Sequence, residues 1–407
     1  MNLKDVYDVK IESLDHQGRG ITRIDNVITF VPNTLPGEVV KIKLDKIHKK
    51  YNEGYLVEII SSSSDRINPI CKYYPQCGGC DLLHMSYDNQ VRYKEDKVKN
   101  IMKRYADLDC VNEIVKCETP FNYRNKVTFQ VDNVIGPYKK RSYEIIPIDK
   151  CLLVDERINE YLCILNKRDL SNINQIVFRV SNNDIMVVFK CNGDINIDIS
   201  DLDGTFIKEC NGKSTIMKGN GYIISNIGDM KYKVSSSSFF QVNSNQVKKL
   251  YDIVLEYLDL DGTESVLDLY CGTGTIGIYI ANKCKDVLGV EINKDAINDA
   301  NENVKINNIS NARFIAGDAS KVIKDLNYKP DKIVVDPPRA GLDKDVINKI
   351  FEMKPSLVVY VSCDPITLAR DLNVFKEKYT VDKITPVDMF CNTMHVENVV
   401  VLERKDV

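Results

Sequence analysis

The chain has 407 residues, of which 43% are hydrophobic and 28% charged, and its formal net charge at pH 7 is −3. This length is enough for two or three hydrophobic cores. The near-neutral net charge gives no global indication of nucleic-acid binding, so any such binding must use local patches. The first residues lack the apolar segment of a signal peptide and no apolar run is long enough to span a membrane, so we expect a cytoplasmic protein. The 13 cysteines should then be thiols or metal ligands rather than disulfides.

The first segment, residues 1–62, has the pattern of a small β-structure. Apolar and polar residues alternate in four runs: 7–11, 27–31, 39–44 and 55–59. A period of two predicts strands with one buried face. Short strands separated by glycine and proline predict an OB-like β-barrel, and Ser61–Ser64 predicts a linker after it.

A central, mostly β domain is expected over 63–235, and it begins with a cluster of cysteines. Cys71, Cys77 and Cys80 have the spacing C-x5-C-x2-C, and Cys151 follows far downstream. Four thiolates suit a [4Fe–4S] cluster or a tetrahedral zinc ion, and the spacing alone does not decide between them.

Strands and helices alternate in the last segment, 236–407. Short apolar runs predict buried strands at 265–269, 287–290, 332–335 and 357–361. Helical patterns occur at 247–258, 275–281 and 294–307. This alternation predicts an α/β domain with a doubly wound, Rossmann-like sheet.

A glycine-rich loop, D-L-Y-C-G-T-G at 268–274, follows the first of these strands and leads into a helix. Glycine there lets the backbone approach a bound cofactor closely, although a tight strand–helix turn alone would also use it. Glu291 ends the next strand and could accept hydrogen bonds from two ribose hydroxyls, and Asp318 suits an adenine amino group. The loop lacks the Lys-Ser/Thr of a phosphate-binding P-loop. Its form resembles that of class I methyltransferases, which favours S-adenosylmethionine over a dinucleotide.

Two further motifs offer chemistry. D-P-P-R-A-G (336–341) follows a strand at the place where such sheets bind ligands. Cys363, in V-S-C-D, follows the next strand and offers a thiolate that could add to carbon 6 of a pyrimidine, which makes carbon 5 nucleophilic. Glu397, in H-V-E-N, is the best candidate for the base that then removes the carbon-5 proton. A buried structural thiol and a charged strand start are the alternatives for these two residues.

Together these motifs resemble the RNA uracil-5-methyltransferase family, which includes enzymes that act on 23S rRNA and on tRNA. They occur in the family's order: S-F-F-Q-V-N (238–243), D-L-Y-C-G-T-G, D-P-P-R-A-G, S-C-D and H-V-E-N. The resemblance implies a class I, S-adenosylmethionine-dependent methyltransferase domain with Cys363 as nucleophile and Glu397 as base. It also implies six cofactor contacts: Gln241, Tyr270, Thr275, Glu291, Asp318 and Asp336. The N-terminal barrel resembles a TRAM domain, which binds RNA.

The four cysteines of the predicted cluster help to distinguish between rRNA and tRNA as the expected substrate. The family's rRNA-modifying members carry an iron–sulfur cluster on this cysteine pattern, and its bacterial tRNA branch generally lacks the cysteines. The resemblance therefore implies a [4Fe–4S] cluster on Cys71, Cys77, Cys80 and Cys151, and it favours methylation of 23S rRNA. A tRNA uracil-5 methyltransferase remains the alternative. So does a non-catalytic RNA-binding protein, which the intact Cys363 and Glu397 disfavour. RNA cytosine-5 methyltransferases carry a second cysteine near the two prolines, and none occurs here.

Basic and aromatic residues are expected to form the RNA-binding surface of a monomeric protein. Three groups of such residues stand out: Lys41, Lys43, Lys46, Lys49, Lys50 and Tyr51; Arg92, Lys94, Lys97, Lys99, Lys103 and Arg104; and Tyr138–Tyr143. Interleaved cations and aromatic rings suit RNA, although a single charge run is more often a solvated surface. F-N-Y-R-N-K at 121–126 matches a further motif of the family near its active site. The target uridine would have to leave its stack to reach Cys363.

Overall fold

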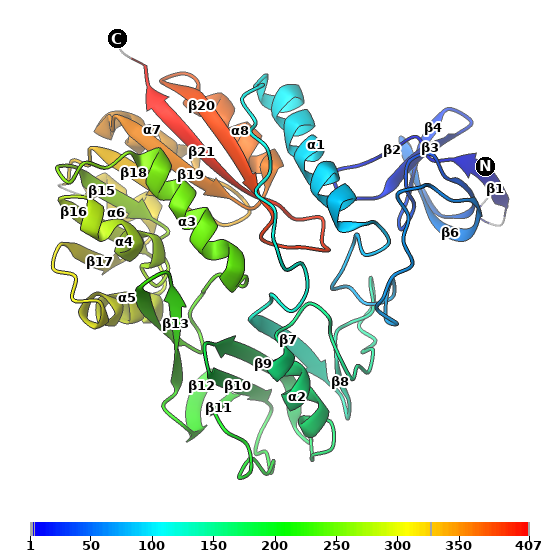
Figure 1. Ribbon diagram of the computed structural model, residues 1–407, viewed down its shortest axis with the longest axis horizontal. Helices are drawn as coiled ribbons and strands as arrows, with labels where there is room; N and C mark the ends of the chain where they lie inside the picture. The colour runs from blue at the N-terminus through cyan, green and yellow to red at the C-terminus, as the bar shows by residue number, and fades with distance from the viewer. Residues whose placement is uncertain (1–2, 4, 326–327, 406–407) are drawn as a thin grey trace. The chain divides into compact units, whose positions relative to one another are not determined.

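The computed structural model describes residues 3, 5–325 and 328–405 of the chain. The chain divides into two compact units (Figure 1). The first, here called the barrel unit, consists of Met1–Lys97, Tyr138–Ile146 and Phe390–Met394. The second, here called the sheet unit, consists of Val98–Pro137, Pro147–Met389 and His395–Val407. The three-domain division with boundaries near 62 and 235 stays a prediction.

Six strands form the β-sheet of the barrel unit, in the order β1-β5-β6-β4-β3-β2. Their bounds are Val6–Lys10 (β1), Ser13–Leu14 (β2), Gly20–Ile24 (β3), Val27–Val31 (β4), Val39–Ile47 (β5) and Tyr51–Ser61 (β6). The period-two pattern turns every second side chain inward, and Val9, Ile24, Val40 and Ile42 belong to the resulting core. The predicted all-β module at the start of the chain is confirmed.

A buried ion pair fixes the end of this module. Glu38 is fully buried, and its carboxylate accepts hydrogen bonds from the Leu35 backbone N–H (2.8 Å) and from Arg66 Nη2 (2.8 Å). Arg66 Nη2 also donates to the Asn33 carbonyl (2.9 Å). Burial raises the pKa of Glu38, but the hydrogen bonds from Arg66 and Leu35 outweigh it, so the net pKa is lower than usual.

Two distant stretches of chain complete the barrel unit. Lys140 donates a backbone hydrogen bond to the Gln76 carbonyl (2.8 Å). Helix α1 (Tyr87–Ala106) carries Lys94, whose Nζ donates to the Phe390 carbonyl (2.9 Å). Lys94 is fully buried, so the expectation that it contributes to an RNA-binding surface is wrong, because its ammonium serves the fold instead.

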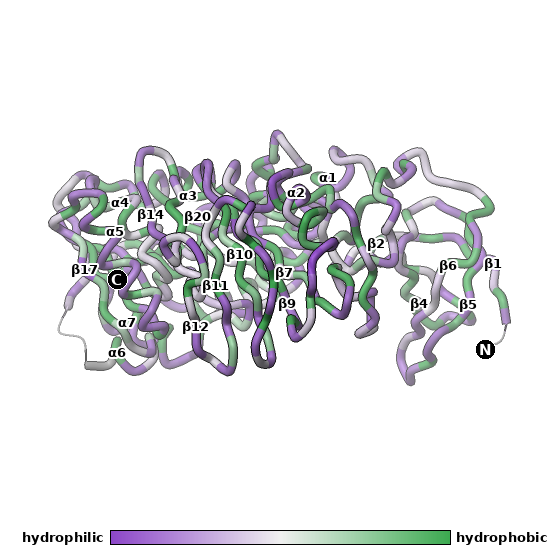
Figure 2. The backbone as a smooth tube through the Cα atoms, turned by 90° about the horizontal axis from the view of Figure 1, so that it is seen from below, coloured by the Kyte–Doolittle hydropathy of each residue, from purple (hydrophilic) through white to green (hydrophobic). Residues whose placement is uncertain are grey.

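The sheet unit contains a central six-stranded sheet in the order β12-β11-β10-β9-β7-β8. Its strands are Lys126–Val131 (β7), Ile135–Gly136 (β8), Ile173–Ser181 (β9), Asp184–Cys191 (β10), Thr205–Cys210 (β11) and Lys213–Lys218 (β12). Helix α2 (Glu156–Leu165) packs against β9. Long apolar runs in β9 and β10 form the hydrophobic segments that Figure 2 colours green. A hairpin of β13 (Tyr222–Ile227) and β14 (Met230–Ser235) follows.

The second sheet of this unit has seven strands, in the order β17-β16-β15-β18-β19-β21-β20. The strands are Ser265–Leu269 (β15), Asp286–Glu291 (β16), Ala312–Ala316 (β17), Lys332–Val335 (β18), Leu357–Ser362 (β19), Tyr379–Val387 (β20) and Glu397–Arg404 (β21). The accompanying helices are Ser244–Leu258 (α3), Thr275–Ile280 (α4), Lys294–Ile306 (α5), Ala319–Asp325 (α6), Lys344–Met353 (α7) and Pro365–Phe375 (α8), with a 3₁₀ turn η1 at Ala281–Lys283.

Five strands of this sheet, β15 to β19, run parallel to one another, and β21 pairs antiparallel with β19. Helices lie on both faces (Figure 1), which buries the strands and explains their continuous apolar sequences. The strand order reverses at β15, which lies between β16 and β18. Ligands bind beyond the carboxyl ends of the strands at such a switch point. The predicted Rossmann-like α/β sheet is confirmed.

We predict that Glu38→Gln lowers the free energy of unfolding of the barrel unit by about 2–4 kcal/mol, because it leaves the Arg66 guanidinium without its buried partner. Since the folded pKa of Glu38 is depressed, its contribution is present above the unfolded pKa and is lost as the pH falls through the folded pKa. Urea denaturation at neutral and acidic pH measures both effects. The control is Glu58→Gln, which removes the exposed pair with Lys41 and should change stability by less than about 1 kcal/mol.

Candidate active site

Most of the residues expected to do the chemistry come together at one edge of the seven-stranded sheet. Tyr270 follows β15, Glu291 ends β16, and Asp336 follows β18. Cys363 follows β19, and Glu397 begins the antiparallel strand β21. Because β21 runs opposite to β19, its first residue lies at the edge where β19 ends, and Ser362 is paired with Asn398.

The glycine-rich loop turns sharply after β15. Tyr270 has a positive φ of 63°, an uncommon conformation for a non-glycine residue and one that often marks a functional site. Gly274 has a φ of 75°, and a Cβ there would lie 2.8 Å from the Phe314 ring. A side chain at position 274 would therefore displace Phe314. The loop is a close-packed turn, and it places its backbone at the carboxyl edge of the parallel strands.

Acidic side chains line this loop. Glu291 accepts hydrogen bonds from the backbone N–H groups of Gly272 (3.2 Å) and Asn293 (2.9 Å), which fixes its carboxylate beside the loop. Asp318 accepts from the backbone N–H and the hydroxyl of Ser320 (3.0 and 2.7 Å). The Ser320 hydrogen bonds lower the pKa of Asp318, so this carboxylate stays ionised and able to accept from a ligand.

A further acid, Asp268, lies below the loop at the end of β15 and was not among the predicted site residues. It is fully buried; Oδ2 accepts from the Gly277 backbone N–H (2.9 Å), and Oδ1 has no hydrogen-bond partner. Burial, with the negative charges of Asp336 and Glu291, raises the pKa of Asp268 to about 8. An acid within the otherwise apolar strand Ser265–Leu269 was the sequence signal that could have marked it.

Two further predicted cofactor residues, Gln241 and Thr275, each take part in a hydrogen bond within the fold. Gln241 is buried, and its backbone carbonyl accepts from Asn125 Nδ2 (3.1 Å). The Thr275 hydroxyl, at the start of α4, shares a 2.7 Å hydrogen bond with the Tyr251 hydroxyl. That hydroxyl already has a partner within the fold, and the role of Thr275 in cofactor binding stays a prediction.

Cys363, Glu397 and Asp336 form one electrostatic group. Burial, together with the charges of Glu397 and Asp336, raises the pKa of the Cys363 thiol to about 11, although the charge of Arg339 opposes them. Burial and the Asp336 charge raise the pKa of Glu397 well above its usual value. Burial also raises the pKa of Asp336, to about 7. Carboxylates with raised pKa values are stronger bases than ordinary ones, so this group is suited to accept protons near neutral pH.

Hydrogen bonds hold the two sides of this group in place. Asn398 is buried, and its Nδ2 donates to the carbonyl of Ser362 (3.2 Å), the residue before Cys363. On the other side, Thr367 Oγ1 of α8 donates to the Arg339 carbonyl (3.0 Å). Asp371 accepts from the Leu342 backbone N–H (2.8 Å) and the Tyr360 hydroxyl (2.7 Å). Asn398 and Asp371 therefore help to position this group, and neither was among the predicted site residues, although Asn398 ends the H-V-E-N motif.

The predicted cluster cysteines are divided between the units. Cys71, Cys77 and Cys80 belong to the barrel unit and Cys151 to the sheet unit. Each of the four is half-buried and forms no disulfide. In the described part of the chain, no group of three or more His, Cys, Asp or Glu side chains is arranged to hold a metal ion. The cluster stays a prediction.

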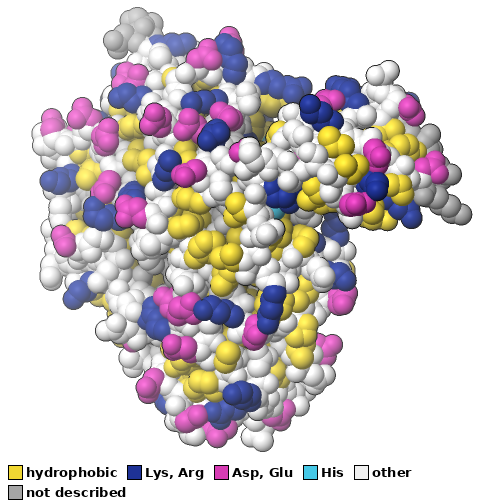
Figure 3. All heavy atoms as spheres, turned by 45° about the vertical axis from the view of Figure 1, so that its right-hand side comes forward, with side chains coloured by type: hydrophobic (Ala, Val, Ile, Leu, Met, Phe, Trp, Pro, Cys, Tyr) yellow, Lys and Arg dark blue, Asp and Glu magenta, His cyan; other side chains and the backbone are white. Residues whose placement is uncertain are grey.

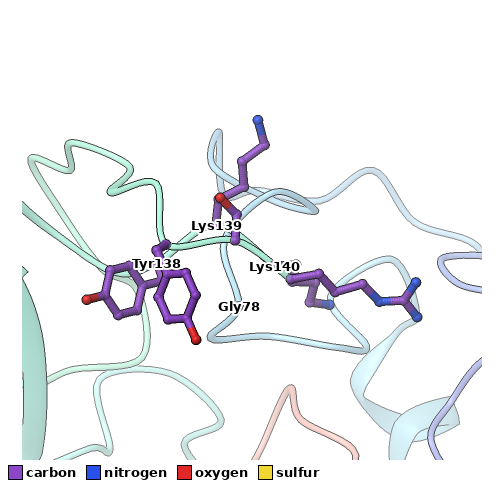
Figure 4. Close-up of a pocket in the computed structure, with 7 residues that line it drawn as sticks. Gly78, Tyr138, Lys139 and Lys140 are labelled. Carbon is purple, nitrogen blue, oxygen red and sulfur yellow. The ribbon is translucent and has the colours of Figure 1, made fainter.

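The barrel unit presents a basic and aromatic pocket of about 500 Å³ (Figure 4). Its lining residues are Gly78, Tyr138, Lys139, Lys140, Arg141, Ser142 and Tyr143. The Tyr138 and Tyr143 rings meet edge to face, with centroids 5.7 Å apart, and Tyr143 is 90% exposed. Lys139, Lys140 and Arg141 have acidic partners: Glu144, Asp81, and Asp45 with Glu53, respectively.

Other residues expected to contact RNA lie on surfaces where basic and acidic side chains are interspersed. Lys46, Lys49 and Lys50 are exposed at the end of β5 and the turn after it, where the His48 ring stacks on Tyr51 (centroids 4.4 Å apart). Basic and acidic side chains are interspersed over the face shown in Figure 3. Among the helices that the structure describes, none is long and apolar enough to cross a membrane.

Comparison with known proteins gives the family. Residues 213–405 match the family model described as tRNA (Uracil-5-)-methyltransferase, and residues 3–57 match that of the TRAM domain. Among solved structures, the tRNA (uracil-54, C5)-methyltransferase of Pyrococcus abyssi in complex with S-adenosyl-L-homocysteine is 28% identical, with a TM-score of 0.80. The match covers 97% of this chain and 100% of that one.

Curated relatives match over nearly their whole length. An uncharacterized RNA methyltransferase of Clostridium acetobutylicum is 38% identical, covering 98% of this chain and 97% of the relative. A second, from Halalkalibacterium halodurans, is 37% identical, covering 100% and 98%. With Cys363 and Glu397 at one edge of a methyltransferase-like sheet and these relatives along the full chain, the protein belongs to the RNA uracil-5-methyltransferase family.

Proposed function

We propose that this enzyme methylates carbon 5 of uridine in 23S rRNA through a covalent adduct with Cys363. The observation that carries the proposal is the convergence of Cys363, Glu397 and Asp336 at the carboxyl edge of the sheet, beside the glycine-rich loop. A thiol with two basic carboxylates is what addition, proton removal and elimination at a uracil ring require.

S-adenosylmethionine fits the loop, and it supplies an electrophilic methyl group when bound. Asp268, with its unpartnered and buried Oδ1, provides an acceptor beneath the loop. Glu291 and Asp318 present carboxylates beside and beyond the loop for ribose hydroxyls and an adenine amino group. Tyr270 offers a ring, and Gln241 and Asp336 complete the proposed contacts. The complex of the archaeal neighbour with S-adenosyl-L-homocysteine supports the same assignment.

The residues act in a defined order. The Cys363 thiol loses its proton to a nearby carboxylate, and its sulfur bonds to carbon 6 of the uracil, so that the π electrons of the carbon 5–carbon 6 double bond move onto carbon 5 and the carbon-4 carbonyl oxygen. Carbon 5 would then take the methyl group from the sulfonium of the bound cofactor, whose sulfur–methyl bond would break to leave the neutral thioether S-adenosylhomocysteine. Glu397 removes the carbon-5 proton, and the carbon 6–sulfur bond breaks to return the Cys363 thiolate. The raised pKa of Cys363 means that the thiol predominates at neutral pH before substrate binds, so a neighbouring base is required.

We predict that Cys363→Ala abolishes methylation while S-adenosylmethionine affinity changes by less than about threefold, since the cofactor contacts proposed above are on other strands. The variant should also fail to form a covalent adduct with RNA that contains 5-fluorouridine, as a denaturing gel would show. Cys163→Ala, which alters an exposed cysteine of α2, is the control and should behave as wild type. An adduct that persists in Cys363→Ala would rule out this nucleophile.

A second prediction concerns the base. Glu397→Gln should still add to uridine and take the methyl group, but kcat should fall by about 10²–10⁴ because proton removal is lost. A methylated protein–RNA adduct should therefore accumulate on ordinary uridine RNA. Glu403→Gln, an exposed position on the same strand, is the matched control. Wild-type turnover by Glu397→Gln would assign the proton to another group.

The proposal of 23S rRNA rather than tRNA as the substrate rests on the four cysteines. The resemblance of Cys71, Cys77, Cys80 and Cys151 to the pattern of rRNA-modifying members favours 23S rRNA. The family model's name and the archaeal neighbour, a tRNA (uracil-54, C5)-methyltransferase, favour tRNA as the second candidate. Mapping 5-methyluridine in both RNAs from cells that lack this protein separates the two, because only the true substrate loses the modification.

The same cysteines are proposed to hold a [4Fe–4S] cluster. We predict about four irons per chain in anaerobically purified protein, and loss of iron on Cys77→Ser but not on Cys110→Ser. Polar methyl transfer needs no electrons, so the proposed role is structural. Stoichiometric zinc instead of iron would contradict the proposal.

A further inference from the structure

Two cations lie directly opposite each other on the central sheet. Lys126 of β7 is paired with Arg179 of β9 in the antiparallel register, so their side chains leave the same face. Arg179 is only 4% exposed. No acidic side chain in the described chain forms an ion pair with either residue, and like charges at directly opposed positions destabilise a sheet. The fold retains a repulsive pair where a neutral residue would be more stable.

The hydrogen bonds of Arg179 are incomplete. Its Nη2 donates to the carbonyl of Ser238 (2.6 Å), but its buried Nη1 has no hydrogen-bond partner. An unsatisfied buried guanidinium nitrogen is costly. The nearest carboxylate that influences it, Asp299, is occupied by Ser235 and by the Ser238 hydroxyl (2.6 Å). The free donor of Arg179 therefore calls for an acceptor that the described residues do not supply.

Lys126 shows the same lack of a partner. Burial, together with the charges of Arg179, Lys190 and Arg124, lowers the pKa of its ammonium to about 8. Arg124 is held close by, because its Nε donates to the Lys126 carbonyl (3.0 Å). Three cations thus gather at this place, and a bound anion would relieve their repulsion.

The face that carries Lys126 and Arg179 is covered over β9 and β10, where Val177, Met186 and Val188 are buried, and it reaches solvent at β7. Helix α2 packs on the opposite face of the sheet (Figure 1). On that face, Tyr161 stacks on Phe206, and Phe206 stacks on Phe189. Successive residues of a strand alternate between faces, so Arg179 points away from the face that carries Phe178. Thr128, two residues beyond Lys126 on the same strand, is exposed.

We propose that Lys126 and Arg179 form a binding site for a backbone phosphate of the RNA substrate. The proposal rests on the assignment of RNA as substrate, and it adds the place where one phosphodiester docks. Charged nitrogens without acidic partners suit phosphate, since arginine and lysine together supply several donors to its oxygens. Arg179 also holds the carbonyl of Ser238, at the start of the stretch that leads to Gln241 and contains Phe239, which is 60% exposed. The phosphate site is therefore joined to the loop expected to reach the cofactor.

The test uses Lys126→Gln in the full-length protein with unmodified substrate RNA. We expect RNA affinity to fall about tenfold, and the slope of log K against log salt concentration to become shallower by about 0.7–0.9, as for one lost phosphate contact. The KM for RNA should rise while kcat and S-adenosylmethionine affinity stay near wild type. Without RNA, the variant should be more thermostable, because the repulsion with Arg179 is removed.

Two further variants complete the design. Lys126→Arg restores the charge and should recover RNA affinity to within about twofold. Lys208→Gln, which alters a lysine of the same sheet that is paired with Asp194, should leave affinity and salt slope unchanged. Wild-type RNA affinity and salt slope in Lys126→Gln would overturn the proposal, as would weakened cofactor binding with unchanged RNA binding. RNA binding is measured without turnover, so a failure of the uracil methylation assay in wild-type protein is a separate result.

Discussion

The pairing of β21 with β19 is the constraint on which the proposed chemistry depends. Ser362 lies opposite Asn398, and this register brings the residues on either side, Cys363 and Glu397, to the same edge of the sheet. A shift by one residue would turn the Glu397 side chain to the other face, because side chains alternate along a strand. The hydrogen bond from Asn398 to the Ser362 carbonyl reinforces the register at the point where an error would matter most.

Burial of the carboxyl edge of the seven-stranded sheet also changes the pKa values of its acidic side chains. Asp268, Asp336 and Glu397 all have raised pKa values, with burial as the largest cause in each case. Three carboxyl groups near one another are unfavourable for folding in the absence of a compensating cation. A ligand with a positive sulfonium would offset part of this cost, so cofactor binding should be stronger than its hydrogen bonds alone suggest.

The sequence predicted the parts of the molecule that follow local rules. The strands at 265–269 and 332–335 were placed to the residue, since continuous apolar runs in parallel sheets leave little ambiguity. Helix α2 was missed because a pattern of only ten residues between strand-like segments is a weak signal for a helix. The burial of Lys94 and the orphaned nitrogen of Arg179 could not be foreseen, because both depend on contacts between residues far apart in the sequence.

The barrel unit is assembled from three stretches of chain, and the last of them is Phe390–Met394. Asn392 accepts a hydrogen bond from Gln90, and Met394 receives one from Lys97 at its carbonyl. During synthesis on the ribosome, the N-terminal strands therefore emerge roughly three hundred residues before the segment that completes their unit, a sequence separation that slows folding. The protein should spend much of its translation with an unfinished barrel unit, a period in which chaperones have access to it.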